Sequence, residues 1–453
     1  GQPDETEASV HVSDGTIAAI LDMDAKVEGA RVIDAAGKIV MPGFVDTHRH
    51  VWQTQLRTVA ADWTLYDYLV NMRSVYSGFY EAEDAYLGNY VGSLEALNAG
   101  ITTLVDHCHL INSPEHTDRL IDGLEESGIR AIFCHGMFVN PKFNPFSMEE
   151  GPGWRYDDIA RIRRERIKVG TGRIALGVNP QEPESGPPQR LHDEVVRFRE
   201  MGVKAISMHV AMGCYDGQNR VVQHLAEAGL LGPDMIFVHG ASLTPEEIEA
   251  IRAAGSGISS TPETELQMGM GYPLALSGRD AGTRISLGID IVSNYPGDMF
   301  SQMRIAMQMA RAQDNEELAR RHRAPRRLRV KARDALRLGT LGGAEALHME
   351  HSIGTIEVGK AADIIVIGTD SLAMTPSHDA IGAVVLGASA SDVDTVIVDG
   401  VVRKENGMLV GVDMPALRAR LMESARRIHV SATYVPRDGI HALWGSIFPH
   451  LSD

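Results

Sequence analysis

The 453-residue sequence predicts an α/β fold: a (β/α)8 TIM barrel with a small β-sandwich domain built from both chain ends. Two observations predict this class. Between residues 101 and 290, short β-branched runs alternate with helical stretches, as successive β-α-β units do. Residues 8–40 and 355–411 instead have the pattern of short strands and turns, and neither flank alone could close a core.

Eight short runs are the candidate strands of the barrel. Each is rich in β-branched residues, and helical stretches separate one run from the next. Eight such units match a (β/α)8 barrel, which typically spans roughly 250 residues. In chain order the runs are Lys38–His48, Ile101–His107, Ile129–His135, Arg173–Asn179, Val203–His209, Met235–His239, Ser256–Thr261 and Arg284–Asp290.

Apolar spacing and capping signals predict the helices between these strands. From Tyr86 to Leu97, apolar side chains recur every three or four residues, and Ala99-Gly100 follows as a stop signal. The segment Thr244-Pro245-Glu246-Glu247 has the pattern of a capping box with Pro at the first helical position. Residues 314–347 are Arg-rich and helical in pattern, which favours a solvated helix pair over an anion site.

These elements divide the chain into three parts. We predict that residues 1–40 and 351–411 form the composite β-sandwich domain. The barrel would occupy residues 41–350, inserted between the two halves of the small domain. Residues 412–453 would form a C-terminal helix and tail.

Composition narrows the class of partner. The chain has 43 Lys and Arg against 60 Asp and Glu, a net charge of −17, which argues against nucleic acid and anionic membranes. No apolar run approaches the roughly 18 residues of a membrane span. We expect a small-molecule substrate, with a homo-oligomer left open. Three widely spaced cysteines, Cys108, Cys134 and Cys214, fit a reducing cytoplasm better than a disulfide framework, so a cytoplasmic location is predicted.

The main chemical signal is the pair His48 and His50. Because side chains alternate along a strand, both point the same way at the carboxyl end of the first strand, where barrel active sites lie. On this spacing alone, a pair of surface histidines is an equal alternative. Recurrence at later strand ends favours a metal site, since His209, His239 and Asp290 also lie there. Four imidazoles and a carboxylate suit Zn or Fe(II) and leave positions open for water.

Four segments carry a resemblance to a known family. They are the lead-in Met41-Pro42-Gly43-Phe44-Val45-Asp46-Thr47-His48-Arg49-His50, the helix end and strand Ala99-Gly100-Ile101-Thr102-Thr103, the ordered His209, His239 and Asp290, and Val358-Gly359-Lys360-Ala361-Ala362-Asp363-Ile364. Together they resemble the amidohydrolase superfamily, within it the branch of triazine hydrolases and cytosine- or adenosine-type deaminases. The resemblance covers nearly the whole chain.

The resemblance implies a ligand set and an activity. His48, His50, His209 and Asp290 would bind one divalent metal ion, Zn or alternatively Fe(II). A metal-activated water would then hydrolyse a non-peptide C–N bond of a small, cyclic or heterocyclic substrate. An aminohydrolase or C–X hydrolase acting on an N-heterocycle is the alternative, and a non-catalytic relative is a further one. The fourth strand ends at Asn179 without a Lys, which disfavours the carbamylated-lysine binuclear subtype.

One departure from the family concerns proton transfer. The deaminase branch places a Glu three residues after the fifth-strand His, where Met212 stands here. Because a thioether cannot transfer protons, we predict His239 and Asp290 as the catalytic residues. The helix dipole favours Glu263 and Glu265, after the seventh strand, as an acid cluster at a helix N-terminus, and a replacement proton shuttle is the alternative.

Further residues at the rim are candidates for substrate binding, because loops at the strand ends build barrel active sites. For each of them, a structural role is the alternative. The set is Trp63, His107, His109, His135, Asn179, Glu263 and Glu265.

Overall fold

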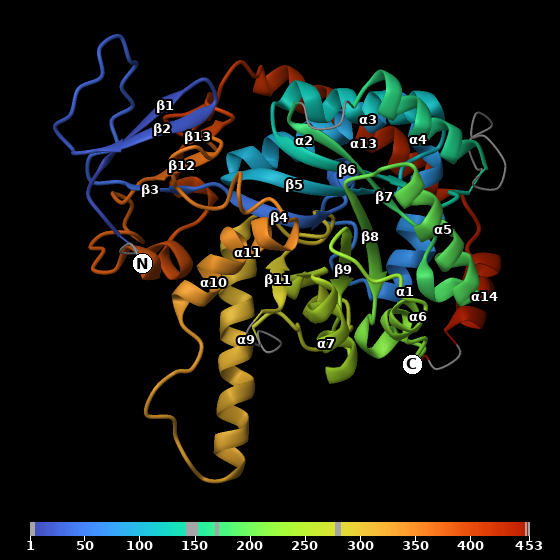
Figure 1. The fold of residues 1–453 in the computed structure, drawn as a ribbon. Helices are drawn as coiled ribbons and strands as arrows, with labels where there is room; N and C mark the ends of the chain where they lie inside the picture. The colour runs from blue at the N-terminus through green and yellow to red at the C-terminus, as the bar shows by residue number, and fades with distance from the viewer. Residues whose placement is uncertain (1–4, 142–152, 168–171, 277–281, 449–450, 452–453) are drawn as a thin grey trace.

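The computed structural model describes residues 5–141, 153–167, 172–276, 282–448 and 451 (Figure 1). Its main part is a sheet of eight parallel strands in the order β4 to β11, which confirms the predicted barrel. The two edges approach each other where Arg49 bridges to Asp290. The strands are β4 (Phe44–Arg49), β5 (Ile101–Cys108), β6 (Arg130–Gly136), β7 (Ile174–Asn179), β8 (Ala205–Val210), β9 (Met235–His239), β10 (Gly257–Ser260) and β11 (Arg284–Leu287).

The first predicted strand divides into two at Gly43. Residues before it form β3 (Ile39–Pro42), which belongs to the small sheet, and residues after it form β4 of the barrel. Gly43 fits this crossing because a Cβ there would lie 2.1 Å from Oγ1 of Thr102. A continuous apolar run cannot reveal such a change of sheet, because both halves are strands.

Helices surround the barrel as the alternation predicts. The capping box at Thr244 is present, with its hydroxyl accepting from the backbone N–H of Glu247. Gly100 follows the second helix at φ +85°. The helices are α2 (Ala82–Asn98), α3 (Pro114–Ser127), α4 (Gly153–Glu165), α5 (Pro188–Glu200), α6 (Val221–Glu227), α7 (Pro245–Ala254), α8 (Pro262–Gln267), α9 (Met299–Arg320), α10 (Ala332–Gly339) and α11 (Leu341–Ala346).

Short helical turns follow several strands on the side where the strands end. After β4 the chain forms η1 (Val51–Leu56), α1 (Leu65–Tyr68), η2 (Leu69–Arg73) and η3 (Tyr76–Phe79). After β7 it forms η4 (Pro183–Ser185), and after β8 it forms η5 (Gly213–Tyr215). These three connections supply much of the pocket described below.

The small domain combines strands from both flanks, as predicted. The hairpin of β1 (Ser9–Ser13) and β2 (Thr16–Leu21) joins the second flank by backbone hydrogen bonds, including Ile17 N to Lys360 O at 2.8 Å. A second, antiparallel sheet has the order β15-β14-β13-β12-β3. Its remaining elements are β12 (Ile364–Ile367), β13 (Val393–Val398), β14 (Val401–Glu405) and β15 (Met408–Leu409), with α12 (Ala380–Gly382), η6 (Ala383–Gly387) and η7 (Ala390–Asp392) between β12 and β13.

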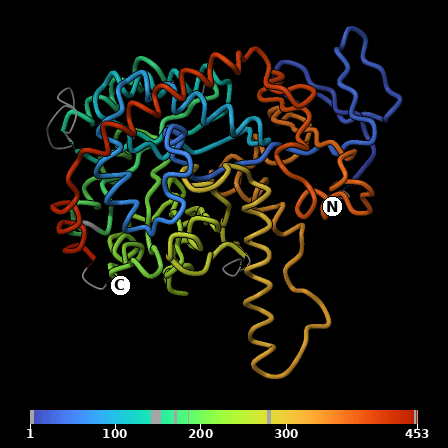
Figure 2. Tube along the Cα trace, turned by 180° about the vertical axis from the view of Figure 1, so that it is seen from behind, coloured from blue at the N-terminus to red at the C-terminus, as the bar shows by residue number. Residues whose placement is uncertain are grey.

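Two helical regions extend beyond the barrel and the small domain or lie along their outside. The helix α9 and the segment after it extend well away from the body of the molecule (Figures 1 and 2). The C-terminal region holds two helices, α13 (Met414–Thr433) and α14 (Asp438–Ile447), which run along the barrel. Within the described ranges, no helix has both the length and the apolar character that a membrane crossing would require. The limits of the three predicted parts stay a prediction.

Candidate active site

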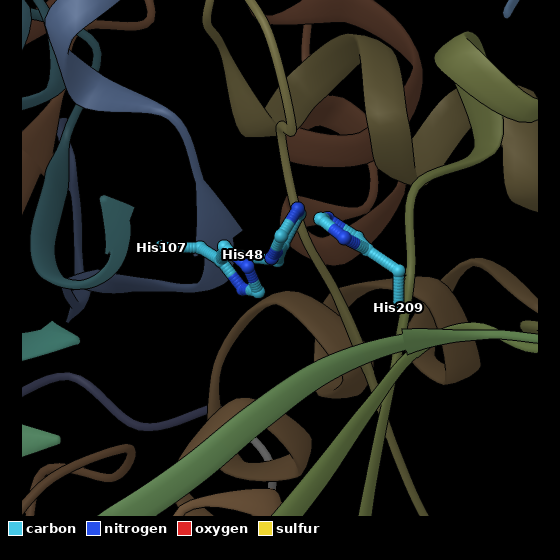
Figure 3. Close-up of side chains that lie close together, drawn as sticks. All are labelled: His48, His107 and His209. Atoms are coloured by element: carbon cyan, nitrogen blue, oxygen red, sulfur yellow. The ribbon is translucent and has the colours of Figure 1, made fainter. Parts of the chain in front are cut away.

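Five histidines and one aspartate from the ends of four strands, β4, β5, β8 and β11, meet at the rim of the barrel. Figure 3 shows three of these side chains, His48, His107 and His209, close together. The ring centroids of His48 and His209 lie 5.1 Å apart, and those of His107 and His209 lie 4.3 Å apart. The other three members of this rim cluster are His50, His109 and Asp290, and all six are buried.

Asp290 is the anionic centre of the cluster. Its Oδ1 lies 3.3 Å from Nε2 of His48 and 3.2 Å from Nε2 of His50. Nδ1 of His50 donates to the carbonyl of His107 at 2.7 Å, which leaves Nε2 of His50 as the free donor atom. Burial alone would raise the pKa of Asp290, but the contacts with His48 and His50 outweigh it and hold that pKa well below its usual value.

The histidines meet the chemical requirement of metal ligands. Burial holds the pKa of His48 and of His107 well below 6.5, so both rings are neutral and carry a free lone pair. Nδ1 of His48 has no hydrogen-bond partner among the described residues. Three sets place their ligand atoms within 4.8 Å of one another: His48, His107 and His209; His50, His109 and His209; and His48, His50 and Asp290. The donor set therefore fits a divalent metal ion.

Two rim residues have an unusual backbone. His239 has φ +73° and Asp290 has φ +69°, in the left-handed region that residues other than Gly rarely adopt. Backbone hydrogen bonds hold Asp290 in place, since its N–H donates to His48 O at 2.8 Å and its carbonyl accepts from His50 N at 2.7 Å. Strain of this kind is often found at functional sites.

Two residues that follow the seventh strand, Thr261 and Glu265, contact His239. Nδ1 of His239 lies 3.0 Å from Oγ1 of Thr261 and 3.6 Å from Oε1 of Glu265. Burial lowers the pKa of His239, but Glu265 and Asp290 outweigh that effect and raise it above 6.5. Glu265 is fully buried and also accepts from the N–H of Thr261 at 2.8 Å.

The other sequence candidates have separate positions. His135 lies 3.1 Å from Asp158, and Asn179 donates to the carbonyl of Cys108 at 3.3 Å. Glu263 accepts from Gln302 at 3.0 Å, and burial raises its pKa to about 7. Trp63 packs near Tyr76, with ring centroids 6.4 Å apart. Of the seven substrate candidates, only His109 lines the described pocket.

The pocket opens beside the rim cluster and has largely apolar walls. His50, His209, His239 and Asp290 line it together with His109. Its apolar wall comes from the first loop, the loop after α8 and the last helix, through side chains that include Leu65, Met268, Met270, Trp444 and Phe448.

Three charged pocket residues were missed by the sequence analysis: Arg73, Glu182 and Glu184. Glu182 accepts from Nδ1 of His209 at 3.3 Å, and Nη1 of Arg73 lies 3.7 Å from its other oxygen. Burial would raise the pKa of Glu182, but His209 and Arg73 outweigh it and lower it to about 2. Glu182 and Glu184 come three and five residues after Asn179, which ends β7. Scanning the whole loop after the fourth strand would therefore have found them.

Comparison with known proteins agrees with this geometry. A model of the amidohydrolase family matches residues 39–403. The chain is 26% identical over 435 residues to the 5-methylthioadenosine/S-adenosylhomocysteine deaminase of Thermoanaerobacter pseudethanolicus, covering 94% of this chain and 96% of the relative. It is 28% identical over 392 residues to the 5'-deoxyadenosine deaminase of Methanobrevibacter smithii, covering 84% and 85%.

Two solved structures share the fold. An adenosine deaminase from Xanthomonas campestris with bound zinc superposes with a TM-score of 0.82 at 24% identity, over 94% of both chains. The atrazine chlorohydrolase of Arthrobacter aurescens in complex with zinc gives 0.79 at 22% identity, over 92% of this chain and 95% of that one. Barrel, rim and relatives define a metal-dependent hydrolase of carbon–nitrogen bonds other than peptide bonds. The chain belongs to the amidohydrolase family, as the sequence predicted.

Proposed function

We propose that this protein is an aminohydrolase that releases ammonia from an amino-substituted N-heterocycle, such as the adenine ring of a small nucleoside. The observation that carries the proposal is the buried His and Asp cluster at the base of an apolar pocket. Relatives named as deaminases of 5-methylthioadenosine, S-adenosylhomocysteine and 5'-deoxyadenosine support this substrate class.

The proposed metal ligands are His48, His50, His209 and Asp290, holding one zinc ion. A single ion is supported because each pair of the three possible ligand sets shares one residue, either His48, His50 or His209, so the sets cannot be filled independently. Fe(II) has similar ligand preferences, and metal analysis distinguishes the two. When bound, such an ion lowers the pKa of water from about 15.7 toward about 7 and so makes hydroxide available at neutral pH.

The chain's own groups then have distinct roles. Asp290, ionised and pointing at both His48 and His50, takes the proton of the attacking water. His239, supported by Thr261 and Glu265, donates a hydrogen bond to the ring nitrogen on which charge develops. The apolar wall contacts the faces of the ring and excludes bulk water.

A second candidate is hydrolysis of a C–X bond on the same kind of ring. Met212 favours it, because Met212 lines the pocket where the deaminase branch has a proton-carrying Glu. A leaving group such as chloride departs without a proton, so a thioether at this position, which cannot transfer protons, is compatible with the reaction. The two candidates differ only in the bond that breaks.

The proposal includes a cytoplasmic location, supported by cysteines that are all free thiols in the described structure. Light scattering of the purified chain would show whether the protein forms a homo-oligomer.

The experiment that tests the function combines metal analysis with product release. The purified protein is assayed for ammonia from adenosine, 5-methylthioadenosine, S-adenosylhomocysteine, cytosine and aminotriazines, and for chloride from the matching chloro-heterocycles. Ammonia release from a nucleoside supports the aminohydrolase, and chloride release alone supports the second candidate. No release of either from a zinc-loaded chain would exclude both.

The ligand set has its own prediction. His48→Ala should lose bound metal and activity together, because it removes a buried nitrogen 3.3 Å from Asp290. His351→Ala, at an exposed histidine, is the matched control and should keep both. Full metal occupancy and turnover in His48→Ala would contradict the assignment.

A further inference from the structure

Breaking a C–N bond requires a proton for the leaving nitrogen, so the pocket must supply an acid. In the described part of the chain, three carboxyl groups line the pocket: Glu182, Glu184 and Asp290. Asp290 lies 3.3 Å from Nε2 of His48 and 3.2 Å from Nε2 of His50, and it is itself a proposed metal ligand. Glu182 lies 3.3 Å from Nδ1 of His209 and 3.7 Å from Nη1 of Arg73. Both carboxyl groups are therefore engaged by basic side chains.

Glu184 differs from both in its contacts. It lies in η4 after the fourth barrel strand, and its Oε1 accepts from the backbone N–H of Ala211 at 2.9 Å. No basic side chain pairs with it among the described residues. Ala211 immediately precedes Met212, so this hydrogen bond ties the carboxyl group of Glu184 to the loop that carries Met212 into the same pocket.

The surroundings of Glu184 favour its neutral form. Burial is the main cause, Asp216 and Glu182 add repulsion, and the hydrogen bond from Ala211 and the charge of His239 oppose them. The net result raises the pKa of Glu184 to about 8. Asp216 directly follows η5, Glu182 directly precedes η4 and His239 ends β9, so three separate parts of the chain contribute. At pH 7 most Glu184 side chains therefore hold a proton.

We propose that Glu184 is the general acid of this enzyme. It lies in the loop after the fourth strand and would replace the acid that the deaminase branch has at the position of Met212. The inference rests on the proposed aminohydrolase function. It makes Glu184 a catalytic residue that contacts the leaving nitrogen of the substrate.

The proton transfers balance as follows. Water oxygen bonds to the ring carbon, the C=N electron pair moves to the ring nitrogen, and one water proton passes to Asp290. Glu184 then gives its proton to the exocyclic amino group. The C–N bond breaks as the ring nitrogen's pair restores C=N, and ammonia leaves with the bonding electrons. The product forms as its hydroxy tautomer, and solvent carries the proton from Asp290 back to Glu184.

The first test compares Glu184→Gln with the wild type on an amino-heterocycle and on the chloro-heterocycle with the same ring. Ammonia release should lose about 10²–10⁴ in kcat with little change in KM, the usual range for a lost general acid. Chloride release should change less than fivefold, because chloride needs no proton. An equal loss on both substrates would overturn the proposal, and so would no loss on either.

The pH profile gives a second readout. Because the protonated form is active, kcat/KM of the wild type should fall as pH rises through about 8. That limb should be absent in Glu184→Gln. The matched control is Glu194→Gln, a buried carboxyl on α5 outside the pocket, which should keep both the rate and the limb. A basic limb that survives in Glu184→Gln would contradict the assignment.

Rescue tests the position of the acid. In the double variant Glu184→Gln/Met212→Glu, a carboxyl group returns to the same side of the pocket, and ammonia release should recover at least tenfold over Glu184→Gln. Bound metal and Tm of each variant, measured in parallel, should match the wild type. Loss of metal in Glu184→Gln would instead assign Glu184 a structural role.

A measurement without substrate separates this inference from the function it rests on. Infrared difference spectra between wild type and Glu184→Gln at pH 6.5 should show one protonated carboxylic acid that disappears above pH 9. Its absence would overturn the inference even for an active deaminase. Its presence in a chain that releases no ammonia would refute the proposed function while leaving the acid in place.

Discussion

The left-handed backbone of His239 places its ring between the pocket and the seventh strand. At φ +73° the strand ends abruptly, and the imidazole faces Asp290 and the pocket instead of continuing the alternation of β9. Thr261 and Glu265 then fix the ring from the other side. A side chain held in this way acts on a substrate without reorganisation, which is the condition for strong electrostatic stabilisation.

His239→Asn is therefore expected to lower kcat by about 10²–10⁴. Asn keeps a hydrogen-bond donor but loses the raised pKa of the imidazole. Steady-state kinetics should show kcat and kcat/KM falling together, as for an interaction made only in the transition state. Bound metal should be unchanged, because His239 lies outside the proposed ligand set, and His351→Asn is the exposed control. An unchanged kcat would end this role for His239.

The sequence analysis found the site residues that lie at strand ends, and it missed the site residues that lie in loops. His48 and His50 follow from strand alternation, and they do meet Asp290. Glu182 and Glu184 follow β7 by a few residues, and only the course of η4 turns them toward the pocket. No local pattern encodes that course, because tertiary contacts set it.

Among the elements, α14 is the least expected part of the pocket. It lies more than 140 residues after the last barrel strand, yet Trp444 and Phe448 line the pocket with Met268 and Met270. Nε1 of Trp444 donates to Oγ of Ser74 at 2.8 Å, which fixes α14 to the loop after η2. A short apolar stretch near a chain end predicts a helix but does not say where it packs.

Trp444→Ala is expected to raise KM about tenfold or more with a smaller effect on kcat, because it removes apolar wall and no reacting group. Leu443→Ala is the matched control, since Leu443 is its neighbour on the same helix and is 58% exposed. Kinetics on the best nucleoside substrate decide the matter. A fall in kcat with constant KM would show that the helix serves chemistry instead of substrate binding.

In the whole molecule, the small domain holds the two flanks together. Ile17 from the first flank is 1% exposed and packs with Ala362, Ile364 and Ile397 from the second. The sequence predicted this union because neither flank could close a core alone. It did not predict the change of sheet at Gly43, because the pattern of a buried strand is the same on both sides of that residue.

Ile17→Ala should lower the free energy of unfolding by about 2–5 kcal/mol, the usual cost of such a buried truncation. Ile20→Ala, at a 42% exposed position on the same strand, should cost far less. Thermal and denaturant unfolding measure both variants. Equal stability of the two would mean that the β1–β2 hairpin contributes little to holding the flanks together.

The position of α14 bears on how this enzyme can diversify. The groups proposed to do chemistry come from barrel strands and the turns next to them, whereas Trp444 lies on α14 and Phe448 directly follows it, outside the barrel. Substitutions in α14 can therefore accumulate without disturbing strand register or the ligand set. Descendants of one ancestral catalyst could exchange substrates by drift in this helix alone, so substrate choice is a poor guide to ancestry within such a lineage.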